Sequence, residues 1–145
     1  MKKNAYFRIV NIFLTLDTLP ITVLLWTPEE DHEELLAYNL IKEGYAVASV
    51  HNEDEIVERA LAIAPSVIVM GDCSTDDKFI AITKEVKKKL ADRPPQIMCL
   101  TTRSVSDGPH PVFTVSDGYL SLPAKKKKIV KMVSRLIANG IDNGM

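Results

Sequence analysis

Asp72 is the residue in this sequence that is best placed to do chemistry. It follows the apolar run 65–71, PSVIVMG, and polar residues follow it. A carboxylate at the end of a buried strand can act as a nucleophile or bind a hard cation, and it can equally cap the next helix. The two cysteines, Cys73 and Cys99, have neither CxxC spacing nor paired histidines, so no zinc site or disulfide framework is predicted.

Motifs that define the common reactive sites do not occur in the sequence. It contains no phosphate-binding GxxxxGKS/T or GxGxxG loop, no GxSxG elbow and no HExxH pair. His32, His51 and His110 are scattered among polar residues, and we expect them to be ordinary surface groups. The sequence therefore predicts no cofactor, no metal and no enzymatic activity.

The composition is that of one globular domain. The 145 residues are 46% hydrophobic and 26% charged, and the formal net charge is -1. Such a chain has no net field that would recruit nucleic acid or a membrane surface. In residues 1–20, Arg8 and Asn11 interrupt the apolar run and no cleavage site follows. We therefore expect a protein of the reducing cytoplasm that binds no nucleic acid and inserts into no membrane.

Apolar runs and amphipathic stretches alternate along the rest of the chain. The short connections between them permit only βαβ units, which build a parallel sheet with helices on both faces. Strands are predicted at 21–26, 46–50, 67–71, 96–101 and 119–122, and helices at 29–45 with Gly44 as the cap, at 52–62, from Ser74 or Thr75 to 90, and at 124–138 ended by Gly140.

The segment 103–118 stands where a fourth helix would follow the fourth strand. Gly108, Pro109 and Pro111 make a regular helix through its middle costly. The residues PVFTV, 111–115, are more typical of an extended piece. The sequence therefore predicts an irregular or missing fourth helix.

Four local strings occur in an order and at a spacing that resemble one family. They are EELLAYNLIKEGYAV, APSVIVM, IMCLTT and DGYLSLP. Together they resemble the receiver domains of two-component response regulators. The resemblance implies a flavodoxin-like, doubly wound, five-stranded parallel sheet of order 2-1-3-4-5, with the site at the carboxyl ends of the strands. It divides the chain into an N-terminal apolar extension (1–20), a receiver-like domain (21–139) and a C-terminal tail (140–145).

The resemblance also implies a set of reactive residues, and this sequence lacks most of them. A receiver needs an acidic pair after the first strand for Mg²⁺, a phosphoacceptor aspartate ending the third strand, a hydroxyl ending the fourth, and a lysine before the fifth-strand proline. The equivalent positions hold Thr27 and Pro28, Gly71, Thr101, and Leu122, and Tyr119 matches the aromatic residue of the fifth strand. Only the hydroxyl and the aromatic residue are retained.

The sequence therefore indicates a divergent receiver, a pseudo-receiver that works as a phosphorylation-independent protein-interaction module. One alternative is an active receiver that uses Asp72 as a displaced phosphoacceptor, with Glu29, Glu30 and Asp31 replacing the lost acidic pair. A one-residue slip along a strand turns a side chain to the other face, so we expect the Asp72 carboxylate to point elsewhere. A second alternative is a flavodoxin-like small-ligand binder or enzyme.

Two surface features suggest contacts with other molecules. The lysine run 125–128 places positive charge in a helix's first turn, which is mildly unfavourable. Such a run suggests contact with an acidic partner, nucleic acid or anionic lipid, and the alternative is a helix start that is simply solvated. We expect it to bind a protein partner, a signalling component, through Lys125, Lys126, Lys127 and Lys128. Apolar residues at helical spacing in the N-terminal extension could pack on their own domain or on a second subunit. We expect a homodimer contact through Tyr6, Ile9, Phe13 and Leu16.

Overall fold

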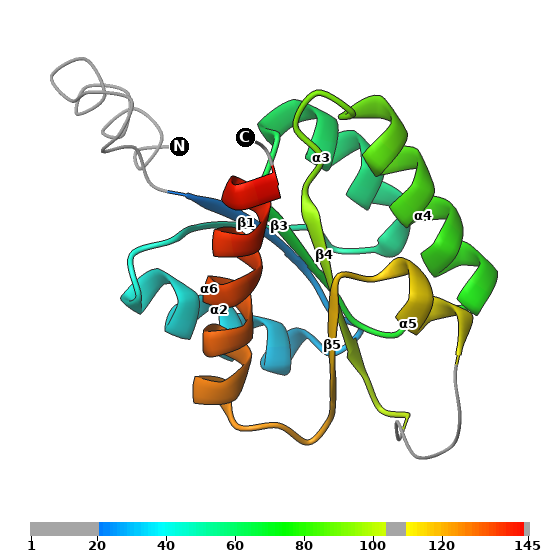
Figure 1. Cartoon of the computed structure of the whole chain (residues 1–145). Helices are drawn as coiled ribbons and strands as arrows, with labels where there is room; N and C mark the ends of the chain where they lie inside the picture. Colours follow the sequence, from blue (N-terminus) through cyan, green and yellow to red (C-terminus); the bar gives the residue numbers. More distant parts are fainter. Residues whose placement is uncertain (1–20, 104–109, 144–145) are drawn as a thin grey trace, which may run out of the picture.

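The computed structural model of the chain describes residues 21–103 and 110–143. A parallel five-stranded sheet forms its centre, in the order β2-β1-β3-β4-β5, as predicted (Figure 1). The strands are β1 (Thr22–Trp26), β2 (Ala46–Ser49), β3 (Val67–Met70), β4 (Gln96–Thr101) and β5 (Gly118–Ser121). The helices are α2 (Glu30–Lys42), the 3-10 helix η2 (Glu53–Glu55), α3 (Ile56–Ile63), α4 (Asp76–Lys89), α5 (Pro111–Val115) and α6 (Lys126–Asn143).

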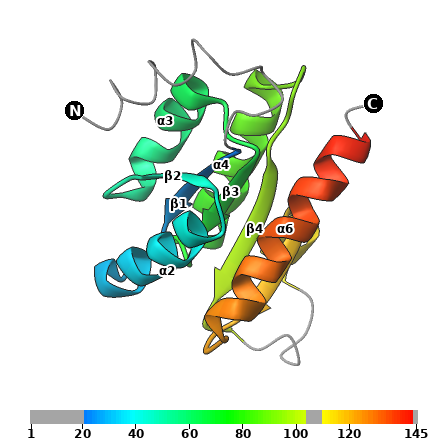
Figure 2. The same ribbon diagram turned by 90° about the vertical axis from the view of Figure 1, so that its left-hand side faces the viewer.

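Helices cover both faces of the sheet, with α2 and α6 on one side and α3 and α4 on the other (Figure 2). The strand β3 shows why its sequence is a continuous apolar run. Val67 and Val69 pack toward α2 and α6, while Ile68 and Met70 pack toward α3, α4 and α5, and all four are fully buried. A parallel strand with two covered faces has no position left for a polar side chain.

Local signals in the sequence end and begin these helices as expected. Gly44 adopts a φ of +98° just after α2, a conformation that favours glycine. The Thr75 hydroxyl oxygen accepts a hydrogen bond from the Lys78 N–H (3.0 Å) and so caps α4. Asn52 accepts the Asp54 N–H (3.0 Å) ahead of α3, as a capping residue does. The two N-caps fix where the loops at the carboxyl ends of β2 and β3 end and the next helices begin.

The fourth helix is short, and one part of its prediction was wrong. The residues PVFTV form the five-residue helix α5 and are not extended. Pro111 occupies the first helical turn, where the missing N–H needs no partner and the fixed φ suits a helix. Residues 104–109, which include Gly108 and Pro109, lie outside the described part of the chain.

The last helix is longer than predicted. It begins at Lys126 instead of 124 and continues through Gly140 to Asn143, so the predicted tail from 140 begins as helix. A Cβ at Gly140 would lie 3.3 Å from Cγ of Gln96 at the start of β4. The glycine is therefore a close-packing position inside the helix and not its end.

Candidate functional site at the carboxyl ends of the strands

A small cleft lies where β1, β3 and β5 end at the same edge of the sheet. Its volume is about 50 Å³. The residues that line it are Thr27, Pro28, Glu29, His32, Gly71, Asp72, Leu100, Thr102 and Leu122. In a doubly wound sheet this edge is the usual place for a site. His32, expected to be an ordinary surface residue, is one of the lining residues.

Pro28 occupies the space that a side chain at position 71 would need. A Cβ built on Gly71 would lie 2.7 Å from Cδ of Pro28 and 3.2 Å from Cα of Thr27. The Gly71 N–H donates to the carbonyl of Trp26 (2.9 Å), which holds the two strand ends together. The position that the resemblance equates with the phosphoacceptor therefore has no room even for a methyl group.

Asp72 is one of the residues that line the cleft. Its Oδ2 accepts two hydrogen bonds from Thr102, one from the backbone N–H (2.9 Å) and one from the hydroxyl (2.8 Å). The strand β3 ends at Met70, so the alternation of faces that the slip argument assumes no longer applies at position 72. Asp72 ties the end of β3 to the end of β4, while Thr75 caps the next helix.

The retained hydroxyl is not in the cleft. Thr101 is fully buried, and its Oγ1 accepts a hydrogen bond from the Arg103 N–H (3.0 Å). The next residue, Thr102, lines the cleft instead, and its hydroxyl donates to Asp72. Leu122 lines the cleft as well, and its N–H donates to the Thr101 carbonyl (2.7 Å).

The acids after β1 do not gather into a metal site. Glu29 lines the cleft, whereas Glu30 and Asp31 are exposed in the first turn of α2. Within residues 21–103 and 110–143, no three His, Cys, Asp or Glu side chains group as a metal site would require. The cleft residues in this part of the chain also include no lysine or arginine. A bound phosphoryl group, which carries nearly two negative charges, would find little electrostatic stabilisation there.

Glu33 is a buried carboxylate that the sequence analysis did not single out. Its residue is only 9% exposed, and in the described structure its Oε1 has no hydrogen-bond partner. Burial raises the pKa of Glu33, and a backbone hydrogen bond from Thr27 and the nearby His51 only partly offset this. Glu33 is one of several acids in the first turn of α2, where negative charge is favourable. The sequence therefore did not distinguish it from its exposed acidic neighbours.

Glu33→Gln is expected to stabilise the protein at pH 7. A carboxylate whose pKa is raised by folding stabilises below its unfolded pKa, about 4.3, and loses that contribution as pH rises. The variant should therefore exceed the wild type in free energy of unfolding at pH 7 and match it more closely near pH 4, as measured by urea denaturation. Glu34→Gln, an exposed neighbour, is the control. An equal difference at both pH values would mean that ionisation of Glu33 is not its cause.

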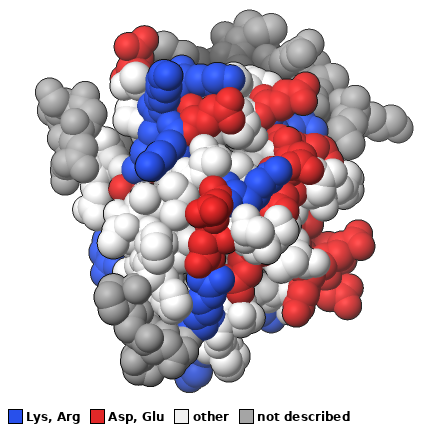
Figure 3. Space-filling model, turned by 90° about the vertical axis from the view of Figure 1, so that its right-hand side faces the viewer, with Lys and Arg blue, Asp and Glu red and all other residues white. Residues whose placement is uncertain are grey.

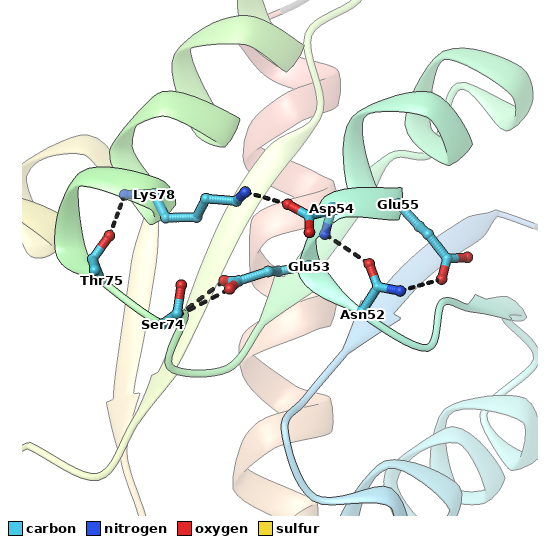
Figure 4. Close-up of polar contacts among 7 residues, drawn as sticks. All are labelled: Asn52, Glu53, Asp54, Glu55, Ser74, Thr75 and Lys78. Atoms are coloured by element: carbon cyan, nitrogen blue, oxygen red, sulfur yellow. Dashed lines mark hydrogen bonds and ion pairs between the residues drawn. The ribbon is translucent and has the colours of Figure 1, made fainter.

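Glu53 links the loop after β3 to the start of the α3 region (Figure 4). Its Oε2 accepts the Ser74 N–H at 3.0 Å. Burial opposes ionisation of Glu53, but hydrogen bonds from Ser74 and Cys73 and the charge of Lys78 together lower its pKa. The neighbouring Asp54 forms an ion pair with Lys78 of α4. These contacts join two loops distant in sequence, so no local pattern announces them.

The aromatic residue of the fifth strand, Tyr119, faces α5. Tyr119 is 37% exposed and stacks on Phe113 with a centroid distance of 4.5 Å. His110 meets the same Phe113 ring edge-on at 5.4 Å. Together the three rings form a small aromatic surface next to β5.

The lysine run lies at the beginning of α6. Lys125, Lys127 and Lys128 are exposed, and Lys126 is half-buried, as expected when one of four consecutive helical residues lies toward the apolar stripe. Among the described residues none of the four forms an ion pair. The predicted dimer contacts, Tyr6, Ile9, Phe13 and Leu16, lie outside the described residues.

No family model matches the chain. Several solved structures resemble it at low sequence identity. Response regulator TrrA of Thermotoga maritima, solved with Mg²⁺ and BeF, has 21% identity to this chain and a TM-score of 0.66. The match covers 80% of this chain and 98% of that one. Chemotaxis response regulator CheY4 of Vibrio cholerae has 19% identity and a TM-score of 0.70, and the match covers 81% of this chain and 98% of that one.

A third similar structure is the receiver domain of a sensor histidine kinase from Pseudomonas aeruginosa PAO1, solved with a magnesium ion in its active-site cleft. It has 20% identity and a TM-score of 0.69, and the match covers 82% of this chain and 98% of that one. None of the helices in the described part of this chain is long and apolar enough to cross a membrane. The strand order, the paired helices on each face and these three matches agree: the chain has the fold of response-regulator receiver domains.

Proposed function

We propose that this chain is a signalling protein of the receiver type that acts without phosphorylation, as a module that binds a protein partner. The observation that carries the proposal is the contact between Pro28 and Gly71. A Cβ at 71 would meet Pro28 Cδ at 2.7 Å, so the phosphoacceptor position is closed by a neighbouring side chain. The position is therefore incompatible with a carboxylate while Pro28 is present.

The electrostatics of the cleft support the same proposal. Phosphoryl transfer depends on cations that neutralise charge in the transition state, supplied in a receiver by Mg²⁺ and a lysine. The side chain of Pro28 has no oxygen to bind Mg²⁺, and that of Leu122 has no charge. The cleft of about 50 Å³ is also far below the several hundred Å³ of ordinary small-molecule sites, which argues against a ligand-binding or enzymatic role.

Incubation of the full chain with acetyl phosphate and Mg²⁺ tests the proposal. We expect intact-protein mass spectrometry to find no phosphoryl adduct, because neither the acceptor nor its cations are in place. A wild-type receiver domain treated in parallel controls for the reagent. An adduct on this chain would contradict the proposal, whichever residue carries it.

Asp72 as a displaced phosphoacceptor is the second candidate function, and one observation favours it. Asp72 lines the same cleft as Gly71 and Leu122. Against it, one carboxylate oxygen already accepts two hydrogen bonds from Thr102. An adduct that forms on the wild type and disappears in Asp72→Asn would establish this second function.

The surface proposed for the partner is the β5 edge of the sheet, with the lysine run 125–128 at the start of α6 on one side and the aromatic surface of α5 on the other. Exposed lysines that form no ion pair with residues 21–103 or 110–143 fit a partner with an acidic surface, and such attraction weakens as salt rises. We place this activity in the cytoplasm, where the free thiols of Cys73 and Cys99 would stay reduced.

Charge reversal at the start of α6 tests this surface. Lys127→Glu with Lys128→Glu is expected to reduce in-cell crosslinking of the chain to its partner severalfold, since both side chains are exposed. Lys84→Glu with Lys88→Glu, two exposed lysines of α4, is the matched control. Equal losses in the two variants would mean that net charge, and not this surface, governs binding.

A further inference from the structure

A groove of about 420 Å³ runs between α3 and α4, on the face of the sheet away from α2 and α6. The apolar part of its lining comes from Val57, Leu61, Ala81 and Ile82. Leu61 is 41% exposed although it is a large apolar side chain. A concave apolar surface between two helices is the kind of surface on which a third amphipathic helix docks.

Charged residues border this groove and give it an excess of negative charge. Four carboxylates and two lysines line it. Both lysines are already neutralised, Lys78 by Asp54 and Lys89 by Glu85 at 3.0 Å. Figure 4 shows the pair of Lys78 with Asp54. Figure 3 shows acidic and basic side chains interleaved over the face of the molecule that lies on the right in Figure 1. Glu58 forms no ion pair within the described residues, so a cationic occupant would find an available acid.

Residues 1–20 have the complementary chemistry. They contain Lys2, Lys3 and Arg8 against the single acid Asp17, and the apolar residues of the extension recur at helical spacing. A helix over 5–16 would be about 18 Å long, close to the roughly 21 Å of α4 with its 14 residues. Residues 17–20 would then serve as a connection of up to about 13 Å.

The extension also enters the fold close to one end of the groove. The Ser66 N–H donates to the Thr22 carbonyl (2.9 Å), so the loop after α3 lies beside the first residue of β1. Leu61 stands in the last turn of α3, shortly before this loop. A connection of four residues would lead the extension from β1 toward the Leu61 end of the groove.

We infer that the groove between α3 and α4 receives the chain's own N-terminal segment, with the apolar residues of 5–16 against Leu61 and Ile82 and its cations near the groove acids. Attachment through so short a connection gives the segment an effective concentration in the millimolar range, which favours docking on its own domain over a second copy. This inference does not depend on whether the cleft accepts phosphate.

The exposed stripe of α2, formed by Leu35, Tyr38 and Ile41, is the competing place for the same segment. Ile21 packs on the α2 and α6 side, so the direction of the chain alone does not choose between them. The groove is favoured because it is concave and lined by an excess of acids, whereas the stripe is the convex surface of one helix.

Hydrogen exchange of the full chain separates the two places. In Leu61→Asp, amide exchange in residues 5–16 should become about tenfold faster or more, the factor that loss of one leucine contact would cause. Ile41→Asp, at a side chain 54% exposed on α2, should leave it unchanged. Exchange in β3 and β4 reports that both variants are folded, and the milder Glu58→Lys should shift the segment in the same direction as Leu61→Asp.

Three outcomes would overturn the inference. Faster exchange in Ile41→Asp but not in Leu61→Asp would place the segment on α2. No change in either variant would mean that the segment docks at neither surface. Protection of residues 5–16 that increases with protein concentration would assign the groove to the segment of a second copy, as in a homodimer.

Discussion

Gly71→Ala is expected to lower the free energy of unfolding by about 2–3 kcal/mol, the usual cost of forcing a methyl group into a filled site. The new Cβ would stand 2.7 Å from Cδ of Pro28, a ring atom with little freedom to move, and 3.2 Å from backbone of Thr27. Pro28→Ala removes the ring atom, so Gly71→Ala should cost at most half as much in that background. Urea denaturation of the four proteins in this double-mutant cycle measures the coupling.

Gly118→Ala is the matched control for this cycle. A Cβ at Gly118 would also be close to a neighbour, 2.9 Å from Sδ of Met132, but that atom ends a flexible side chain that can turn away. Its cost should be smaller and should not change when Pro28→Ala is added. If the effects of Gly71→Ala and Pro28→Ala simply add, the loops relax around the new methyl group, and Pro28 does not close the position.

The sheet could be predicted from the sequence because its signals are local and mutually consistent. The continuous apolar run of β3 and the glycine after α2 each indicate one element, and their spacing leaves few ways to connect them. One error involves a tertiary contact and the other a local signal with two interpretations. Gly140 resembled a helix end, but it lies inside the helix, packed closely against Gln96. PVFTV resembled a strand, but the proline begins a helical turn.

The candidate site was predictable in its position and not in its detail. The strand ends that carry Thr27, Gly71 and Leu122 meet in one cleft, as the resemblance implied. The close approach of Pro28 to Gly71 involves residues far apart in the chain, and the distance between their atoms cannot be read from the sequence. Thr102, and not Thr101, lines the cleft because of the way β4 ends. Sequence patterns locate the end of a strand only to within a residue or two.

Restoring the receiver residues is expected to create phosphoryl chemistry in this fold. The variant that combines Pro28→Asp, Gly71→Asp and Leu122→Lys replaces the obstructing ring with an oxygen ligand, adds a carboxylate at 71 and supplies a cation beside it. We expect it to take phosphate from acetyl phosphate in the presence of Mg²⁺ at least about 100-fold faster than the wild type, since one electrostatic contact of this kind is worth about that factor. Intact-protein mass spectrometry over time gives the rate.

The matched control carries Gly71→Asn in place of Gly71→Asp, with the other two changes kept. It retains the shape and the cation and lacks only the nucleophile, so it should form no adduct. Circular dichroism and urea denaturation must show that the triple variant is folded, because three charged side chains enter a cleft of about 50 Å³. A folded triple variant that accepts no phosphate would mean that positions 28, 71 and 122 are not equivalent to the receiver residues. An adduct that persists with Gly71→Asn and disappears with Asp72→Asn would instead assign the nucleophile to Asp72, which already lies in the same cleft.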